Sequence, residues 1–569
     1  MRNLEIAAVF RDIAKILEIK GENVFRIRAY ERAAQNIESL TEDIERMVRE
    51  ERLTEIPGIG KDLSQRIVEY VTTGSIPLYT DLKKTIPEGL LELLKIPSVG
   101  PKTARLLFDK LKIKSIVDLE QAIEKGRLAG LFGIKEKTIQ NIRHGIELLK
   151  KGKERMTLAQ AVQLGGEFYR ALIKIPEVKE IAVAGSLRRR KETVRDIDIL
   201  AVSGKPVKVM DIFAGLPAVA EVISKGDTKA SVRTRDGLQV DCRVVERRSF
   251  GAALLYFTGS KNFNIKVRQL AIKKGLKINE YGVFRKGKCI AGRSEPEIFK
   301  LLKMQYIEPE LREDTGEIEL ALSSKVPPLV GLEDIKGDFH VHSQWSDGNN
   351  SIQEIAGAAR TRGYSYIAVT DHSQGLRIAH GVRIADLKKK KKEIDRINSG
   401  LKDFRVLFGT EVDIGSDGSL DYPAKVLAGF DIVIAAIHSG FKQSKEQMTR
   451  RLVRACQNRH VHIIAHPTGR LWGVRDPYDI DLAEVFTAAR DSNTSMEINA
   501  FPQRFDLNDI NSRRAKERGV KIAIDTDAHS IDQLAVMGLG VAVARRGWLS
   551  KDDVLNTLPL DTLLRTIKK

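Results

Sequence analysis

The stretch 185–200, GSLRRRKETVRDIDIL, constrains this chain more than any other. Asp196 and Asp198 stand two residues apart in an apolar run. Because side chains alternate along a β-strand, both carboxylates project from one face and the isoleucines from the other. Asp241 lies in a second strand-like run, LQVDCRVV, and pairing of the two strands would bring the three carboxylates together. Mg²⁺ prefers oxygen ligands and leaves room for substrate phosphates, so the pattern predicts a two-metal phosphoryl-transfer site.

Small and basic residues precede the aspartate pair. Gly185 and Ser186 offer close backbone approach and a hydroxyl, and the run 188–191, RRRK, offers positive charge for a triphosphate. An isolated D-x-D pair is more often a solvated strand face than a metal site. The motifs that follow favour the metal site, because YFTGS at 256–260 is succeeded by Asn264 and Arg268.

This order of motifs resembles the nucleotidyltransferase core of the family X DNA polymerases, typified by DNA polymerase beta. The similarity continues through INEYG at 278–282 and IF…YIEP at 298–309, and so covers roughly the first 320 residues. It implies that Asp196 and Asp198 hold two Mg²⁺ ions and that Asp241 helps to activate the primer 3′-hydroxyl. The implied nucleotide-binding residues are Arg155, Gly185, Ser186, Arg189, Tyr256, Phe257, Gly259, Asn264 and Arg268. Val194 and Arg195 depart from the family pattern, which predicts altered affinity and not loss of function.

Composition limits the remaining possibilities. A chain of 569 residues is too long for one core, and its formal net charge of +19 suits a polyanionic partner. Three scattered cysteines indicate a reducing compartment. The N-terminus is charged at every turn, and no segment is apolar for long enough to cross a bilayer. We therefore expect a soluble cytoplasmic, nucleoid-associated monomer whose partners are gapped or primed DNA and dNTPs.

The first 150 residues contain a near-repeat at helical periodicity. IPGIGK at 56–61 and IPSVGPK at 96–102 are followed by a weaker copy, LFGIK, at 131–135. A glycine turn before a helix leaves backbone N–H groups free to hold a phosphate without reading the base. A single such turn is commonly structural, but two copies resemble helix-hairpin-helix DNA-binding motifs. The DNA-binding residues expected on this basis are Arg26, Tyr30, Gly58, Gly60, Lys61, Gly100 and Lys102.

The same resemblance makes one chemical step doubtful. Some members of the polymerase beta family form a Schiff base with a lysine that here aligns with Arg66, and Asp62 falls where a phosphate-binding lysine is common. Arginine stays protonated and forms no imine. We expect this domain to hold the 5′ side of a gap without ordinary 5′-deoxyribose-phosphate lyase activity.

Histidine usage changes abruptly in the last 235 residues. Of ten histidines only His144 precedes residue 340, and most of the others follow apolar, β-branched runs that helical segments separate. Such alternation predicts a parallel β/α barrel with its reactive groups at the carboxyl ends of the strands. Imidazole combined with carboxylate suits Zn²⁺, Mn²⁺ or Fe²⁺ better than Mg²⁺ alone.

This arrangement resembles the PHP domain, the polymerase and histidinol phosphatase superfamily of trinuclear metal phosphoesterases. The resemblance implies up to three ions, with Glu411 bridging two of them. The implied ligands are His340, His342, Glu411 and Asp527 for the first ion, Glu411, His438 and His466 for the second, and Asp347, His372 and His529 for the third. We expect His380, His460 and His462 to be structural or surface residues, and Arg470 is a weaker candidate for a substrate-phosphate contact.

The sequence therefore predicts a multidomain α+β and α/β protein. Its expected parts are a helical helix-hairpin-helix domain (1–150), a beta-type nucleotidyltransferase palm and fingers core (151–320), a linker (321–335) and a distorted β/α barrel of PHP type (336–569). The predicted function is short-gap DNA polymerisation in repair with a metal-dependent 3′–5′ exonuclease; 3′-phosphatase or abasic-site endonuclease action uses the same chemistry. Two alternatives stay open: a template-independent nucleotidyltransferase fused to a small-molecule phosphatase, and a non-catalytic DNA-binding scaffold.

Overall fold

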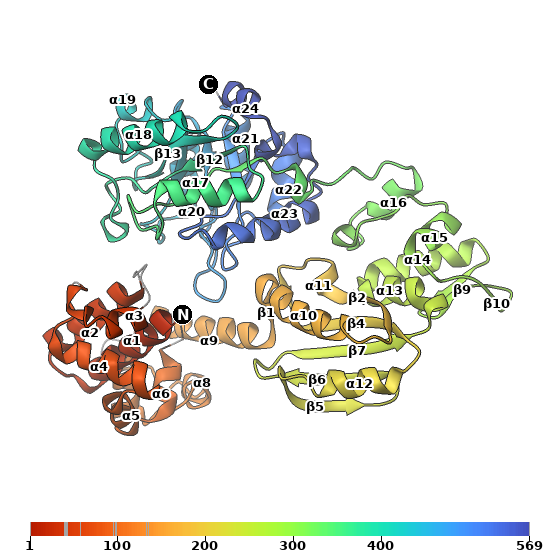
Figure 1. Cartoon of the computed structure of the whole chain (residues 1–569), viewed down its shortest axis with the longest axis horizontal. Helices are drawn as coiled ribbons and strands as arrows, with labels where there is room; N and C mark the ends of the chain where they lie inside the picture. The colour runs from red at the N-terminus through yellow and green to blue at the C-terminus, as the bar shows by residue number, and fades with distance from the viewer. Residues whose placement is uncertain are drawn as a thin grey trace. The chain divides into compact units, whose positions relative to one another are not determined.

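The structure is a computed structural model that describes residues 2–38, 44–56, 58–94, 96, 99–131, 134 and 136–567. The chain forms two compact units, of which the first is built on residues 1–152 and the second on residues 153–472 and 476–569. Figure 1 shows both units, coloured along the chain, and each is described by itself below.

The elements described in the first unit are all helical. Apolar residues at helical spacing, such as Ile6, Phe10, Ile13 and Leu17, are buried in its core as predicted. A short 3-10 helix, Leu53–Glu55, precedes the first of the two glycine turns. The α-helices are α1 (Arg2–Lys20), α2 (Val24–Glu38), α3 (Ile44–Arg49), α4 (Lys61–Thr73), α5 (Pro77–Lys84), α6 (Glu88–Leu93), α7 (Pro101–Leu111), α8 (Ile116–Glu124) and α9 (Glu136–Glu154).

The glycine turns share one backbone geometry. The N–H of Ile59 donates to the carbonyl of Ile56, and the N–H of Val99 donates to the carbonyl of Ile96, both at 3.0 Å. Gly60 and Gly100 then cap α4 and α7 with nearly identical angles (φ −88° and −87°). In the third copy Ile134 donates to Leu131 at the same distance. Six residues of the three copies lie outside the described residues: Pro57, Pro97, Ser98, Phe132, Gly133 and Lys135.

The second unit begins with a five-stranded palm sheet. Its order is β2 (Val178–Val183), β4 (Asp196–Ser203), β7 (Gln239–Val245), β6 (Lys229–Thr234) and β5 (Val219–Lys225). Helices α10 (Leu158–Ile173) and α12 (Pro206–Ala214) pack on the face that carries Ile197 and Ile199. Residues 156–173 read as one helix in the sequence, but α10 begins two residues later than Met156, because β1 (Met156–Thr157) pairs with β3 (Thr193–Val194) and the Thr157 side chain caps α10.

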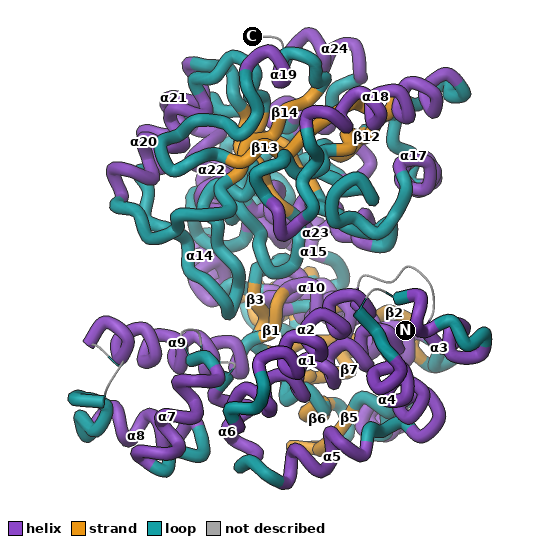
Figure 2. Tube along the Cα trace, turned by 90° about the vertical axis from the view of Figure 1, so that its left-hand side faces the viewer, coloured by secondary structure: helices purple, strands orange, loops and turns teal. Residues whose placement is uncertain are grey.

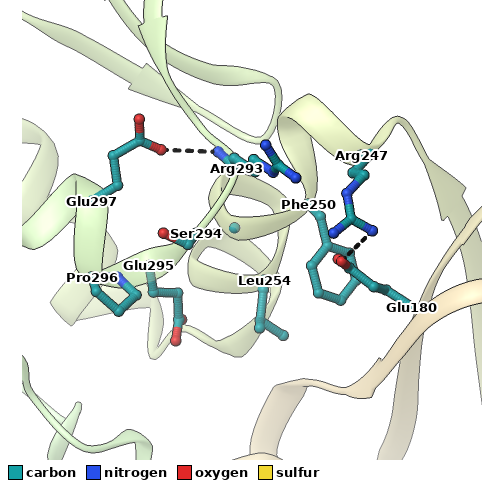
Figure 3. Close-up of a pocket in the computed structure, with 10 residues that line it drawn as sticks. Glu180, Arg247, Phe250, Leu254, Arg293, Ser294, Glu295, Pro296 and Glu297 are labelled. Carbon is teal, nitrogen blue, oxygen red and sulfur yellow. Dashed lines mark hydrogen bonds and ion pairs between the residues drawn. The ribbon is translucent and has the colours of Figure 1, made fainter.

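The thumb follows the palm along the chain. It contains α13 (Phe250–Thr258), α14 (Lys261–Lys273), the antiparallel strands β8 (Lys277–Asn279), β9 (Gly282–Arg285) and β10 (Lys288–Ala291), and the short helices α15 (Glu295–Leu301) and α16 (Glu317–Leu322). At the palm–thumb junction a pocket of about 550 Å³ lies between Glu180, Arg247 and the start of α15, and Figure 3 shows the ion pair between Glu180 and Arg247 on its wall.

Glu295, at the start of α15, fastens the thumb to the palm. It is 4% exposed and forms ion pairs with Arg188 (2.7 Å) and with the fully buried Arg312 (2.5 Å). The hydroxyl of Tyr306 donates to the same carboxylate at 2.9 Å. Burial disfavours ionisation of Glu295, but the two guanidinium groups outweigh it and lower the pKa of this carboxyl to about 2.

The remainder of the second unit is a seven-stranded parallel barrel. Its strands follow chain order: β11 (Gly337–Asp338), β12 (Tyr366–Val369), β13 (Arg405–Asp413), β14 (Ile432–Ala436), β15 (Ile463–Ile464), β16 (Ser495–Asn499) and β17 (Ile522–Asp525). A parallel bridge between Val341 and Ala528 joins the first and last strand regions. The strand-like run 337–342 is therefore split into β11 and this bridge, and the predicted β/α barrel is confirmed.

Helices surround these strands, as Figure 2 shows. They are α17 (Ile352–Thr361), α18 (Ile384–Ser399), α19 (Ala424–Leu427), α20 (Lys445–Cys456), α21 (Leu482–Asp491), α22 (Asp509–Glu517), α23 (Met537–Arg546) and α24 (Leu560–Thr566). Further 3-10 turns lie at Arg247–Ser249, Pro309–Leu311, Leu332–Asp334, Arg377–Ala379, Gln533–Val536, Lys551–Asp553 and Leu555–Thr557. No described helix is both long and apolar enough to cross a membrane.

The end of α23 joins the barrel to the palm and thumb. Arg546, 5% exposed in its side chain, donates to the carbonyl of Arg189 at 2.8 Å and forms ion pairs with Glu313 (3.1 Å) and Asp509 (2.8 Å). Trp548 belongs to the apolar core of the thumb. The barrel and the polymerase-type segment therefore share one compact unit, and a domain boundary within 321–335 stays a prediction.

Candidate active sites

Strand register brings the three predicted aspartates of the palm together. β4 and β7 run parallel with Asp198 directly opposite Asp241, and Asp196 lies two residues away on the same face of β4. All three side chains are half-buried, while Ile197 and Ile199 on the other face are fully buried. The hydroxyl of Ser231 donates to Asp241. The prediction that Asp196 and Asp198 lie on one face of a strand is thus confirmed.

The turn before β4 explains the need for glycine at position 185. Gly185 has φ +65°, and a Cβ there would lie 2.4 Å from a carboxylate oxygen of Asp198. Only glycine tolerates both this conformation and this approach. The adjacent Ser186 hydroxyl is buried and has no hydrogen-bond partner among the described residues, so it is free to donate to a ligand.

The basic residues of this turn are held by the thumb. Arg188 is committed to Glu295 and to the Thr258 hydroxyl (2.7 Å). Arg189 donates to Glu313 (3.1 Å) and to the carbonyl of Thr258.

The other predicted nucleotide contacts lie on or near α13 and α14. Tyr256 is partly exposed and meets Phe257 edge-on, with ring centres 5.1 Å apart. Asn264 donates to the carbonyl of Tyr256 (2.7 Å), and Arg268 donates to the carbonyl of Asn264 (3.3 Å). Separately, Arg155 donates twice to Thr193 in β3 at 2.8 Å.

Crowding of like charges governs the palm site. Burial, together with the neighbouring carboxylates of Asp196 and Asp241, raises the pKa of Asp198 to about 7. Two cations would remove this repulsion, and half-buried oxygen ligands suit Mg²⁺, which keeps part of its hydration shell. The residues present therefore fit a pair of Mg²⁺ ions.

The barrel gathers its histidines and acids at the carboxyl ends of the strands. Glu411, at its centre, is 1% exposed. One of its carboxylate oxygens lies 2.8 Å from Nδ1 of His372 and 3.4 Å from Nε2 of His340, and the other lies 3.0 Å from Nε2 of His466. His438 also approaches this second oxygen at 3.3 Å. The carboxylate thus stands between two sets of imidazoles.

Three sets of ligand atoms are close enough to hold an ion each. They are His340, His342 and Asp527; His372, Glu411 and His438; and His342, Asp347, His372 and His529. His466 completes the second set through its contact with Glu411. All nine predicted ligands thus lie in one cluster, with His342 and His372 each shared between two sets. These sets differ in detail from the predicted assignment, in which His372 belonged to the third ion alone.

Unpaired buried atoms show what this cluster requires. Among the described residues, ring nitrogens of His340, His342, His372 and His438 and one oxygen of Glu411 are buried without a hydrogen-bond partner. Buried polar atoms are costly unless they are paired or bound to metal. Nitrogen-rich ligand sets of this kind fit Zn²⁺, Mn²⁺ or Fe²⁺.

Protonation divides the histidines of the barrel into two groups. Burial opposes protonation of His340, His372, His438 and His529, but the nearby carboxylates outweigh it and raise the pKa of each ring, so a bound cation would have to displace protons there. Burial and the neighbouring imidazoles lower the pKa of His342 to about 4, and burial with the nearby Arg504 lowers that of His466 to about 3. Burial opposes ionisation of Glu411, but the surrounding imidazoles outweigh it and hold its pKa well below the ordinary value. Neutral imidazoles and an ionised carboxylate are the forms that bind metal.

Several supporting groups escaped the sequence analysis. Glu497, fully buried in β16, contacts Nδ1 of His340 at 2.6 Å and accepts from the backbone N–H of His466 at 2.5 Å. Asp413 lies 3.4 Å from Nδ1 of His438. The signal for Glu497 was present, since it is an acid within a short apolar run (SMEIN), just as Glu411 is an acid within FGTEVDI. Acids in this position orient ligating imidazoles.

Two arginines near the cluster differ in their contacts, and the predicted phosphate contact of Arg470 stays a prediction. Arg470 forms an ion pair with Glu192 of the palm at 2.5 Å and donates to the carbonyl of Phe505. Arg504 instead lies 3.3 Å from the ligand Asp527, and one of its buried nitrogens has no partner among the described residues. Of the remaining histidines, His462 accepts from the backbone of Val433 (2.9 Å), as a structural role predicts.

Side chains around the glycine turns of the first unit differ in accessibility. Lys61, Lys102 and Arg26 are exposed. Tyr30 is 2% exposed and its ring lies 5.4 Å from that of Phe10, so it belongs to the core. Arg66 forms ion pairs with Glu69 (3.1 Å) and Asp62 (3.9 Å). The DNA-binding roles of these residues stay predictions.

Known family models match four parts of the chain. A helix-hairpin-helix domain matches residues 1–76 and a SAM-like helix-hairpin-helix tandem matches 90–147. The DNA polymerase beta thumb matches residues 253–313, and the PHP domain matches 338–499. Together with the palm and the barrel, these matches define the class as a beta-type polymerase core combined with a PHP domain.

Similar proteins agree with this class. DNA polymerase/3′-5′ exonuclease PolX of Bacillus subtilis is 39% identical over 573 residues and covers both chains completely. DNA polymerase lambda of Rattus norvegicus is 24% identical over 346 residues, 55% of this chain and 56% of its own. A probable phosphatase of Thermoanaerobacter sp. is 32% identical over 233 residues, 39% of this chain and 89% of its own. The chain belongs to the PolX family, the family X DNA polymerases that carry a C-terminal PHP domain.

Replacing Asp198 by asparagine should stabilise the metal-free protein at high pH. The folded-state pKa of Asp198 is raised to about 7, so between its unfolded value near 4 and pH 7 the folded state binds more protons and stability falls as pH rises. In EDTA, Asp198→Asn should raise the free energy of unfolding by about 2–4 kcal/mol at pH 8 and by little at pH 4. Denaturant titration of wild type, Asp198→Asn and the exposed control Asp227→Asn checks this. An equal gain at both pH values would contradict it.

Replacing Glu497 by glutamine should weaken metal binding in the barrel without disturbing the fold. The glutamine keeps the shape but removes the charge that orients His340. Loss of such a supporting carboxylate typically weakens metal affinity by about 10–100-fold. Competition between the protein and a chelator for Zn²⁺ measures the affinity, with the exposed Glu484→Gln as control. Unchanged affinity would show that Glu497 does not act through His340.

Proposed function

We propose that this protein fills short gaps in DNA by adding dNTPs to the primer 3′ end during repair, and that its PHP domain trims 3′ ends as a metal-dependent 3′–5′ exonuclease. The observation that carries this proposal is the presence of two separate, complete ligand sets in one chain: three opposed carboxylates in the palm and nine histidines and acids in the barrel. Complete sets argue against a non-catalytic DNA-binding scaffold.

In the palm, Asp196, Asp198 and Asp241 would hold two Mg²⁺ ions, which neutralise charge on the transferring phosphoryl group and favour ionisation of the primer 3′-hydroxyl. The Ser186 hydroxyl, which has no partner among the described residues, and Arg189 would bind the triphosphate. Tyr256 and Phe257 would line the sugar and disfavour a ribose 2′-hydroxyl. Asn264 and Arg268 would contact the nascent base pair from the minor groove. Positioning supplies most of the catalysis in transfers of this kind.

In the barrel, the nine ligands would hold up to three Zn²⁺, Mn²⁺ or Fe²⁺ ions, which lower the pKa of a bound water and polarise the phosphodiester. Arg504 would bind a phosphate oxygen of the substrate, since one of its nitrogens is without a partner among the described residues. Glu497 would hold His340 in the orientation that directs its Nε2 toward the other ligands of the cluster. Release of a 3′ nucleotide exposes a new primer end for the palm.

A second candidate activity for the barrel is removal of a 3′-phosphate. The match to a probable phosphatase over 89% of that protein supports it, and the same ligands serve both reactions. Template-independent nucleotide transfer is less well supported, because the glycine turns and the Tyr256–Phe257 pair point to a duplex substrate.

The two activities should be separable by mutation within the full chain. Asp196→Ala with Asp198→Ala should lower dNTP incorporation by about 1,000-fold or more and leave 3′ trimming intact, because it removes only the palm cations. His340→Ala with His342→Ala should do the reverse. A time course on a 5′-phosphorylated gapped duplex, with and without dNTPs, in Mg²⁺, Mn²⁺ and Zn²⁺ measures both reactions.

Circular dichroism of both double variants provides the folding control. Loss of both activities in either folded variant would contradict the two-site proposal. Extension of a single strand with no preference for a gapped duplex would favour the template-independent alternative.

The first unit should bind the 5′ side of a gap without forming a Schiff base there. Arg66, which aligns with the lyase lysine, is tied to Glu69 and Asp62 and carries no free amine. Borohydride treatment with an abasic 5′-phosphate substrate should therefore trap no covalent complex. A trapped complex that Lys61→Ala abolishes would overturn this and identify Lys61 as the nucleophile.

A further inference from the structure

A pocket beside the barrel's metal cluster is not used by the proposed chemistry. Its volume is about 740 Å³, within the range of about 300–1,000 Å³ that small-ligand sites occupy. None of the nine predicted metal ligands lines it. Its walls include Trp345, Gln374, Arg377, His380, Gly381 and Arg383.

The loops that form this pocket are those that carry the ligands. Trp345 lies between His342 and Asp347 in the sequence, and Gln374 follows His372 by two residues. The N–H of Val382 donates to the carbonyl of His372 at 2.8 Å, which closes the loop 372–382 on itself. A Cβ at Gly381 would lie 1.9 Å from the carbonyl oxygen of Ser373, so the closure requires glycine. The pocket therefore has a fixed position relative to the cluster.

Trp345 presents an aromatic surface to this pocket. Its indole N–H donates to Glu393 in α18 at 2.9 Å, and its backbone N–H donates to Ser343 at 3.3 Å. The ring is only half-buried. Because its polar atom is already paired, the ring can offer a ligand mainly stacking and apolar contact.

Two arginines and two aspartates line the pocket. Asp386 pairs with Arg383 and Lys389, whereas Asp421 accepts from the N–H of Gly375 and keeps its charge. Arg377 is exposed, and its side chain has no hydrogen bond or ion pair with any residue that the structure describes. The adjoining helix α18 carries six basic residues against three acidic ones; of its lysine run 388–392, Lys390 is buried against Asp371, while Lys388 and Lys392 are exposed.

An aromatic ring combined with basic groups beside a phosphoesterase centre suits one class of ligand. Proteins bind single-stranded nucleic acid by stacking bases on aromatic rings while basic side chains contact the phosphates. We propose that this pocket holds the nucleotides next to the 3′ terminus of a single DNA strand, with one base against Trp345 and a backbone phosphate against Arg377. The proposal rests on the exonuclease function proposed above.

This subsite would make the barrel prefer frayed ends. A base stacked on Trp345 cannot remain paired with its template, so the strand must leave the duplex before its end reaches the cluster. Mispaired or damaged termini unpair at least cost. The barrel would then select such termini because they separate easily from the template strand, without base-specific contacts.

The test compares a long and a short substrate of the same metal centre in the full-length protein. Trp345→Ala should raise KM for trimming a single-stranded oligonucleotide by about 5- to 100-fold, as expected for loss of one stacked base. Arg377→Glu should raise it as well and reduce its salt dependence. Hydrolysis of bis(p-nitrophenyl) phosphate, which is too short to span both sites, should be unchanged. Arg405→Glu, an exposed substitution at the start of β13, is the charge-matched control.

Unchanged oligonucleotide KM in both pocket variants would overturn the proposal. An equal loss on both substrates would also overturn it, because the pocket would then only support the cluster. Trp345→Phe keeps a ring and guards against misfolding: it should retain most of the affinity while losing the quenching of tryptophan emission that an oligonucleotide causes in wild type. If wild type cleaved neither substrate, the exonuclease function would be wrong. The quenching measurement would still decide the subsite, since oligonucleotide quenching equal in wild type and Trp345→Phe would overturn it.

Discussion

The burial of carboxylates that need compensating positive charge is the physical constraint on which both sites of this chain depend. In the palm, Asp198 faces Asp241 across two parallel strands, with Asp196 on the same face. In the barrel, Glu411 is buried among four imidazoles. Carboxylates in such positions need compensating positive charge, because burial without it is strongly unfavourable.

The two sites meet this requirement in different ways. The palm leaves its carboxylates half-exposed at the end of a sheet, where a hydrated cation can reach them, and the burial that remains raises the pKa of Asp198 to about 7. The barrel buries its ligands and surrounds them with fixed partners, such as Glu497 behind His340 and Asp413 beside His438 at 3.4 Å. Hydrated Mg²⁺ fits the first arrangement, and imidazole-binding ions fit the second.

Much of this organisation could be predicted from the sequence. Strand alternation alone places Asp196 and Asp198 on one face, and strand ends explain why distant histidines meet, since carboxyl ends of parallel strands share one edge of a barrel. Helical periodicity likewise identified the core of the first unit. Such patterns are local or repeat along the chain, and can therefore be recognised in the sequence without a structure.

What could not be predicted depends on contacts between distant segments. Arg470 pairs with Glu192 of the palm, some 280 residues away in sequence, and Arg504 lies 3.3 Å from the ligand Asp527. The ion pair between Arg188 and Glu295 likewise joins residues that are far apart in the sequence. The start of α10 moved by two residues because Met156 and Thr157 found a strand partner in β3. No periodicity encodes these choices.

The junction at the end of α23 bears on how this protein should be dissected. Arg546 supports the backbone of Arg189 and pairs with Glu313, and Trp548 completes the apolar interior of the thumb. A fragment truncated after the thumb would lose these partners and expose part of that interior. Low yield or weak dNTP incorporation by such a fragment would result from its damaged packing. It would not be evidence of communication between the two catalytic centres.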